Sequence, residues 1–403
     1  MNEILSVGLI LLAAVLAGHA AQLARTPEVT GYLAMGLIIG PAGFDLISHD
    51  NIQALGFLSE IALGLILFNI GSIFEITSVA RVGGDALRIT LWEASMAFAL
   101  VAAALLLVGL QWQVALLLAV VAMETAPATT LMVLHEYDAR GPLTDRLLAL
   151  VAMNNMYTLF AFGVVSALLT LLGDSGGGWL AAYRAAHSLG WTVVGSLSVG
   201  ALLGLLTDLL ASRAKEGGES MMLSAGIVLI AVGASRVLGV SPLISTLALG
   251  ATVANASRHG ERLLSALGSA DPPLYAAFFV LAGAELVPSS LLSLGAAGLV
   301  YTAARASGKL AGARLALRTR AVSDVVKREF GYCLISSSSL AVGLTLQIRD
   351  AFPDYASTVT GIVLAAVLIF EIVGPLLARR ALFRTGEAMT VPAPLEAAPE
   401  VAS

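Results

Sequence analysis

The chain has 403 residues, of which 58% are hydrophobic and only 12% charged, and its mean hydropathy is +0.89. A soluble protein carries about a quarter charged residues, so the composition excludes a soluble protein and indicates an integral membrane protein. The formal net charge of −5 says little about function, but the single cysteine, Cys333, excludes an intramolecular disulfide and a cysteine-based metal site.

Apolar runs of about 20 residues recur along the chain between short polar turns, which is typical of transmembrane helices rather than of a barrel. The first run has no basic segment before it and is predicted to be a span, not a cleaved signal peptide. We predict an all-α integral membrane protein with 13 transmembrane helices, at residues 4–24, 28–47, 54–73, 84–110, 112–134, 147–172, 188–211, 220–238, 241–257, 273–292, 293–316, 329–348 and 357–378.

The basic residues predict the orientation of these spans. If the N-terminus lies outside, 17 of the 22 Lys and Arg residues fall on the inner side, as the positive-inside rule requires. We therefore predict an N-out/C-in, multi-pass protein of a bacterial inner membrane. Residues 1–387 are predicted to form a single transporter domain, and the Pro- and Ala-rich residues 388–403 a disordered cytoplasmic tail.

Thirteen spans divide into two six-helix repeats, about 1–172 and 220–387, joined by a linker helix at 188–211. The repeats would have inverted orientations, which is the layout of many secondary transporters. Span 112–134 then corresponds to span 329–348, and both are interrupted at mid-depth, by ETAPATT and SSSS respectively. Matching interruptions in two repeats predict a binding site near the membrane midplane.

The first interruption contains a carboxylate, Glu124, about twelve residues and ~18 Å into its span. A buried acid that titrates can exchange a proton for a cation, and Pro127, Thr125 and Thr129 add freed carbonyls and hydroxyls. The alternative is a structural acid that is permanently protonated or paired with a lysine. The next span contains Asn154 and Asn155, whose amide carbonyls could bind a cation or could only join helices by hydrogen bonds.

Two basic residues, Arg305 and Lys309, lie one turn apart within span 293–316. We predict that Lys309 pairs with Glu124; alternatively, it extends toward the inner interface. The serines of the second interruption could supply oxygen ligands or bond back to their own helix. These are Ser336, Ser337, Ser338 and Ser339.

The remaining polar residues of the spans are interpreted as structural. Asn69 and Glu371 are assigned to packing and to stabilising a helix kink, the latter because it precedes Gly374-Pro375. Glu93 and Asp208 are placed near helix ends, partly hydrated. No cluster of ligands at metal spacing and no nucleotide-binding or catalytic-triad motif occurs. We therefore expect neither an enzyme nor a cofactor, no nucleic-acid partner, and no metal other than a monovalent cation, bound at Glu124, Asn154 and Asn155.

Four phrases of the sequence resemble those of a known family. They are VTGYLAMGLIIGPAG at 29–43, TAPATTLMVLHEYDARGPLTDRLLALVAMNN at 125–155, ASGKLAGA at 306–313 and IFEIVGPLLARRALFRTGE at 369–387. In order and spacing the chain is similar to bacterial monovalent cation:proton antiporters of the CPA2 class. The resemblance implies a NhaA/NapA-like fold with a dimerisation domain, a core domain with two crossed broken helices, a homodimer, and an elevator-like movement of the core.

The sequence departs from this family at the expected ion site. At the positions of Asn154 and Asn155 such antiporters usually carry Asp-Asp or Asn-Asp, and the second acid exchanges the proton for the cation. Lys309 matches the family's intramembrane basic residue, which can pair with the first acid. Glu124 stands where Ala or Thr is expected.

Two hypotheses follow. In the first, the protein exchanges Na⁺, K⁺ or Li⁺ for H⁺ with Glu124 as a relocated carrier. In the second, the fold works without proton coupling, as a uniporter, another small-solute transporter or a non-transporting sensor.

Overall fold

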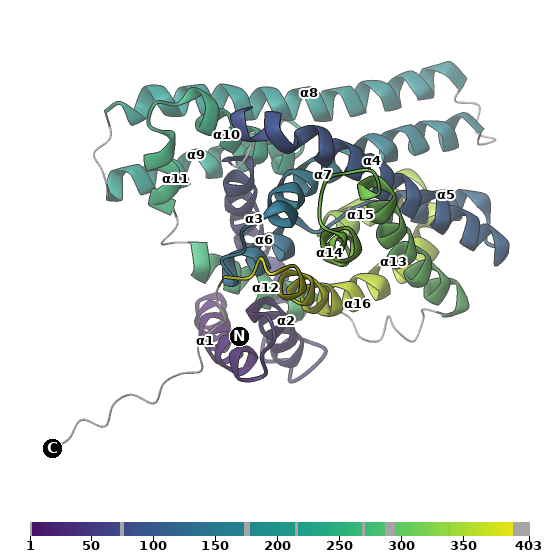
Figure 1. The fold of residues 1–403 in the computed structure, drawn as a ribbon, viewed down its shortest axis with the longest axis horizontal. Coiled ribbons are helices and arrows are strands. Elements are labelled where there is room, and N and C mark those ends of the chain that lie inside the picture. Colours follow the sequence, from purple (N-terminus) through teal and green to yellow (C-terminus); the bar gives the residue numbers. More distant parts are fainter. Residues whose placement is uncertain are drawn as a thin grey trace.

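The computed structural model describes residues 2–72, 76–172, 178–213, 217–267, 271–286, 295–337 and 339–389. Within these ranges all regular secondary structure is helical, so the all-α prediction is confirmed (Figure 1). The helices are α1 (Glu3–Leu23), α2 (Glu28–Ile39), α3 (His49–Ser72), α4 (Ile76–Leu107), α5 (Trp112–Val121), α6 (Pro127–Glu136), α7 (Pro142–Leu172), α8 (Gly178–Ala211), α9 (Gly218–Val237), α10 (Pro242–Ala256), α11 (Gly260–Leu267), α12 (Asp271–Glu285), α13 (Gly295–Leu317), α14 (Asp324–Glu329), the 3-10 helix η2 (Phe330–Leu334), α15 (Ser339–Ala351) and α16 (Pro353–Thr385).

Each predicted span overlaps one described helix or, at the two interruptions, a broken pair of helices. The predicted span 28–47 is too long, because α2 ends at Ile39 before Gly40-Pro41, and the end of span 273–292 lies outside the described residues. Helix ends differ because a hydropathy pattern detects the apolar centre of a helix and not its polar ends: α16 continues to Thr385, past the predicted end at 378. Seven of the described helices are long and apolar enough to cross a membrane. The count of thirteen spans, their orientation and the inverted repeats stay predictions.

Two helices are broken where the sequence predicts. The first break separates α5 from α6 at residues 122–126, and α6 begins with Pro127, which needs no helical hydrogen bond at that position. The second separates η2 from α15, at Ile335 to Ser337 among the described residues. The two breaks meet, because the Ala126 N–H donates to the Ser336 carbonyl at 3.3 Å.

Close packing of α13 against α4 positions the basic residues of α13. A β-carbon added to Gly308 would lie 2.5 Å from the Ala97 Cα, and one added to Gly312 would lie 2.5 Å from the Glu93 Cα. Glycines four residues apart let two helix backbones approach closely in membranes. Lys309 lies between them and is therefore held against α4.

The end of α16 is attached to the turn before α7. Glu387 follows the left-handed Gly386 and accepts hydrogen bonds from the backbone of Leu143 and Thr144, at 2.8 Å each. Of the tail predicted to be disordered, residues 388 and 389 are described, and the Met389 N–H donates to the Tyr137 carbonyl at 3.0 Å. Residues 390–403 lie outside the described ranges.

Candidate ion site at the crossing of the broken helices

Arg305 links the two breaks. Its guanidinium donates to the Ile335 and Ser336 carbonyls of one break, at 2.7 and 3.2 Å, and to the Glu124 carbonyl of the other, at 2.9 Å. It also lies over the Phe370 ring, 4.4 Å from the centroid. A planar group with several donors suits this role because the breaks leave carbonyls without helical partners.

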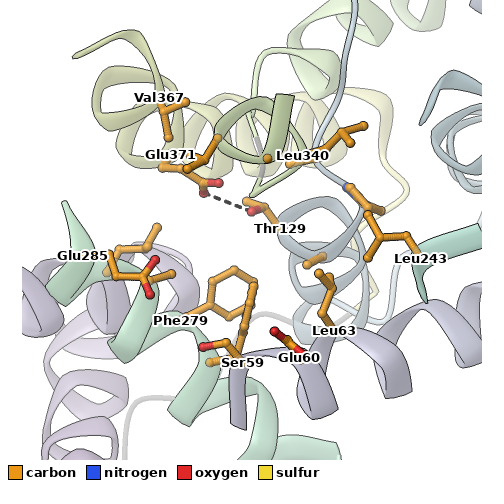
Figure 2. A pocket seen from close by; sticks show the side chains of 18 of the residues that line it. Ser59, Glu60, Leu63, Thr129, Leu243, Phe279, Glu285, Leu340, Val367 and Glu371 are labelled. Atoms are coloured by element: carbon orange, nitrogen blue, oxygen red, sulfur yellow. Dashed lines mark hydrogen bonds between the residues drawn. The ribbon is translucent and has the colours of Figure 1, made fainter. Parts of the chain in front are cut away.

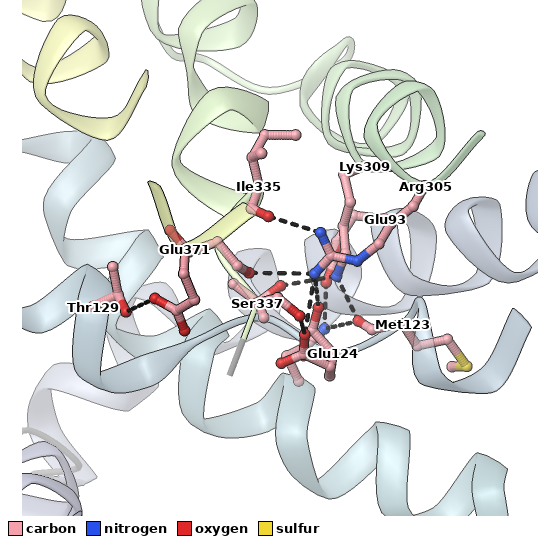
Figure 3. Close-up of polar contacts among 12 residues, drawn as sticks. Glu93, Met123, Glu124, Thr129, Arg305, Lys309, Ile335, Ser337 and Glu371 are labelled. Carbon is pink, nitrogen blue, oxygen red and sulfur yellow. Dashed lines mark hydrogen bonds and ion pairs between the residues drawn. The ribbon is translucent and has the colours of Figure 1, made fainter. Parts of the chain in front are cut away.

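The Glu124 side chain is fully buried and paired. Its Oε1 lies 3.2 Å from Nη2 of Arg305 and accepts a hydrogen bond from the Ser337 hydroxyl at 2.5 Å (Figure 3). The structure thus brings together three of the predicted site residues, Glu124, Arg305 and Ser337. The negative charge of Glu124 is already compensated, so a cation would have to displace Arg305 to bind this carboxylate.

Lys309 forms a second buried ion pair, and its partner is Glu93, which the sequence analysis placed near a helix end. Its Nζ lies 2.8 Å from the Glu93 carboxylate and donates to the Thr125 hydroxyl at 2.8 Å. The predicted pairing of Lys309 with Glu124 is therefore wrong, since the ion-pair partner of Glu124 is Arg305. The predicted partial hydration of Glu93 is also wrong: its side chain is fully buried against α13.

These four charged side chains balance one another. Figure 3 shows Arg305 and Lys309 entering from α13 toward Glu93 and Glu124. All four are at most 1% exposed. Buried ions are tolerated when paired and hydrogen-bonded, so the two pairs can stabilise a crossing that would otherwise leave charges and carbonyls uncompensated.

The adjacent amides have separate roles. Asn154 donates its amide to the Glu93 carboxylate at 2.5 Å and to the Met123 carbonyl at 2.9 Å, which are the interhelical bonds of the structural alternative. Asn155 instead lines a cavity, and its Oδ1 is buried without a hydrogen-bond partner among the described residues. The Oδ1 of Asn154 is buried without a hydrogen-bond partner as well, but of the two residues only Asn155 is among the described residues that line the cavity. Asn155 is therefore the member of the pair that can offer its oxygen to a ligand in the cavity.

This cavity, of about 440 Å³, borders the first break at Ala126. Figure 2 shows side chains that line it. One wall is α3, from Gly56 to Leu67, and Glu285 at the end of α12 lies on another. Glu371 of α16 also lines the cavity, and it accepts a hydrogen bond from the Thr129 hydroxyl at 3.1 Å. Among the described residues that line it are three carboxylates, Glu60, Glu285 and Glu371, and no Lys, Arg or His.

The other predicted site residues fall at or beside the crossing. Pro127 and Thr129 line the cavity, whereas Thr125 faces Lys309. Ser336 contributes its carbonyl to Arg305. Ser338 lies outside the described residues, and Ser339 begins α15.

Sequence reasoning missed two carboxylates at this site, Glu93 and Glu371. The glycines on either side of Lys309 were a usable signal for Glu93, because they show which face of α13 packs closely on another helix. For Glu371 the following Gly374-Pro375 indicated a kink, but no signal in the sequence showed that its side chain faces a cavity.

The sequence profile of the family described as "Sodium/hydrogen exchanger, transmembrane" matches residues 8–381. Part of the chain is similar to the curated "Iron transporter MagA" of Paramagnetospirillum magneticum, with 31% identity over 141 residues. This match spans 35% of the chain and 31% of that protein.

Two solved structures of the sodium proton antiporter MjNhaP1 from Methanocaldococcus jannaschii share the fold. One, determined at pH 8, has a TM-score of 0.68 at 19% identity and covers 96% of this chain and 97% of that one. The other, from electron microscopy, has a TM-score of 0.75 at 17% identity and covers 96% and 98%.

Proposed function

Because the chain belongs to the sodium/hydrogen exchanger family, we propose that it is a secondary transporter that exchanges a monovalent cation, Na⁺, K⁺ or Li⁺, for H⁺. The observation that carries the proposal is the cavity that borders the crossing of two broken helices, beside buried carboxylates. Such crossings provide freed carbonyls and polar side chains at membrane depth, which is where secondary transporters bind ions. The cavity is lined by acids, which suits a cationic substrate.

Access to the site would alternate by an elevator-type movement of a core domain in a homodimer of the bacterial inner membrane. The family resemblance supports this part of the proposal. Cations and protons are the only substrates it requires.

The assignment of Glu124 as the carrier of proton and cation stays a prediction. For this role the Arg305 guanidinium, 3.2 Å away, must separate from the carboxylate before a cation can replace it. A single titrating carboxylate that exchanges one cation for one proton would make transport electroneutral.

A second candidate function is transport without proton coupling. The amides at Asn154 and Asn155 favour it, since neither can titrate where the resembling antiporters carry an acid. The partial match to an iron transporter adds Fe²⁺ to the substrates worth testing.

Purified protein in liposomes with a pH-sensitive dye inside would test both. Under an imposed pH gradient, exchange predicts proton movement on addition of Na⁺, K⁺ or Li⁺, and none with choline or in protein-free liposomes. Cation flux without proton movement would support the second function. No flux with any of these ions or with Fe²⁺ would contradict both.

A further inference from the structure

We propose that Glu371, with Thr129 and Asn155, forms the cation-binding site, and that Glu124 stays paired with Arg305. This inference rests on the proposed function and assigns its exchanging carboxylate to α16. The three residues line the cavity from α16, α6 and α7.

The three side chains provide the oxygens that an alkali-metal cation needs. Glu371 supplies a carboxylate, held by one hydrogen bond from the Thr129 hydroxyl at 3.1 Å. Asn155 supplies an amide oxygen that is buried without a hydrogen-bond partner among the described residues. Hard cations prefer carboxylate, carbonyl and hydroxyl oxygens, and all three residues line the same cavity.

The helix around Glu371 frees another oxygen. Pro375 lies within α16 and has no N–H, so it cannot donate to the carbonyl four residues earlier, which belongs to Glu371. A proline at this position therefore serves the site as well as the kink. Both the side chain and the backbone of Glu371 become available on one stretch of helix.

Charge distinguishes Glu371 from Glu124. Glu124 shares its carboxylate with a guanidinium at 3.2 Å and a hydroxyl at 2.5 Å, so a cation would have to displace Arg305. The described contact of Glu371 is a neutral hydroxyl near the N-terminus of α6, whose partial positive charge favours an anion without neutralising it. A cation can bind Glu371 without breaking either buried ion pair.

The cavity also favours entry of a cation. Glu60 and Glu285 line the same cavity as Glu371 (Figure 2). Glu60 forms an ion pair with Arg236, whereas the lining residues that the structure describes include no basic side chain. Acidic clefts with low-dielectric walls raise the local concentration of cations.

The position of Glu371 also explains how cation transport is coupled to proton transport. An uncompensated carboxylate at membrane depth costs free energy, so the carboxylate of Glu371 is stabilised when it binds either a proton or a cation. Because one carboxylate cannot hold both in the same position, each displaces the other. Competition at Glu371 alone yields one cation exchanged for one proton.

Cation-dependent thermal stabilisation of the purified protein tests the site without requiring transport. A bound ligand raises the apparent Tm with its concentration. We expect Na⁺, K⁺ or Li⁺ to stabilise the wild type relative to choline and Glu371→Gln to abolish the shift. Asp354→Asn, which removes an exposed acid from the same helix, should keep it. An undiminished shift in Glu371→Gln would overturn the inference.

Exchange in liposomes separates this inference from the proposed function. If the wild type exchanges and Glu371→Gln exchanges equally well, the site is wrong and the function stands; if the wild type does not exchange, the function fails. Should Glu371→Gln not fold, the double variant Thr129→Val/Asn155→Leu takes its place. It leaves Glu371 intact and is expected to raise the cation concentration for half-maximal exchange at least tenfold. An unchanged concentration would refute the site.

Discussion

The ammonium of Lys309 lies 2.8 Å from the carboxylate of Glu93, and no solvent reaches either side chain. One turn earlier on the same helix, Arg305 forms the equivalent pair with Glu124. Helix α13 therefore presents two cations to two acids from different parts of the chain, α4 and the first break. Because each charge is compensated, the crossing can be polar without holding a net charge at membrane depth.

Lys309→Met is expected to destabilise the protein strongly. It leaves the Glu93 charge buried without its ion pair, and removing one partner of a buried pair costs about 3–5 kcal/mol. The apparent Tm in detergent should fall by many degrees. The double variant Glu93→Gln/Lys309→Met removes both charges and should recover much of the loss. If the two single effects simply add in the double variant, the pair is not coupled and the interpretation is wrong.

Arg305→Lys tests whether geometry or charge matters at the crossing. The substitution keeps the charge, but a compact ammonium cannot bond the Ile335 and Glu124 carbonyls on both breaks together, as the guanidinium does. We expect a lower apparent Tm and slower exchange. Arg318→Lys, on the turn after α13, serves as the control for the same exchange of side chains. Wild-type behaviour of Arg305→Lys would show that a positive charge alone suffices.

The breaks could be predicted from the sequence because their signals are local. Pro127 and the run of serines each disturb the helix in which they occur, whatever packs against it. The sequence therefore predicts both interruptions. The structure adds that they are in contact, through the hydrogen bond from the Ala126 N–H to the Ser336 carbonyl.

The partners of the basic residues could not be predicted, because they depend on tertiary packing. Glu93 is more than 200 residues before Lys309. The glycines beside Lys309 indicate the face of α13 that packs closely, but nothing in the sequence identifies α4 as the helix that packs there. Likewise, the pattern around Glu371 is consistent with a buried kink or with a cavity wall. Only the positions of α6 and α7 show that this acid faces Thr129 and lines the cavity with Asn155.

Asn155→Asp should change the coupling of transport. It adds a second carboxylate, besides Glu371, to the proposed cation site, so more than one proton can be displaced by each cation. Exchange should then depend on membrane potential, which a K⁺ gradient with valinomycin can set in Na⁺-loaded liposomes.

Asn154→Asp is the matched contrast to this variant. Asn154 donates to Glu93 at 2.5 Å, so an aspartate there puts like charges together. It should lower the apparent Tm without adding potential dependence. If wild type shows no proton flux and Asn155→Asp creates it, the natural protein is not an antiporter.

Glu136→Gln should alter how stability depends on pH. This residue follows the predicted span 112–134 and accepts a hydrogen bond from the Glu28 N–H at 2.7 Å. Burial raises the pKa of Glu136 from its ordinary 4.5 to about 7; the hydrogen bond from Glu28 opposes the shift, the Glu28 carboxylate adds to it, and Tyr137 and Arg379 oppose it. The folded state therefore holds this proton more tightly than the unfolded chain.

The raised pKa makes protonated Glu136 stabilise the folded state at low pH. The contribution of Glu136 to the free energy of unfolding is complete below about pH 4.5 and is lost as the pH rises toward 7. The reason is that only the unfolded chain releases the proton in that pH range. Glutamine does not titrate and can still accept from the Glu28 N–H. The difference in apparent Tm, variant minus wild type, should grow from pH 5 to 7 and then level off. A difference that is constant with pH would exclude the shift.

Glu387 is expected to anchor the start of α7. Its two carboxylate oxygens accept from the N–H groups of Leu143 and Thr144 and from the Thr144 hydroxyl, each at 2.8 Å. A side chain that caps free N–H groups at a helix N-terminus contributes about 0.5–2 kcal/mol. Glu387→Ala should therefore lower the apparent Tm by several degrees. Truncation after Met389 leaves these bonds intact and should not.

Gly141 provides an independent check on the same contact. Its φ is +148°, and a β-carbon there would lie 2.5 Å from Cδ of Glu387. Gly141→Ala should destabilise the protein, because it strains the backbone and displaces the capping carboxylate. In a Glu387→Ala background the clash disappears and only the backbone term is left, so the second substitution should cost less. Equal costs in both backgrounds would show that the Glu387 side chain does not occupy this position, and would place the cap of α7 elsewhere.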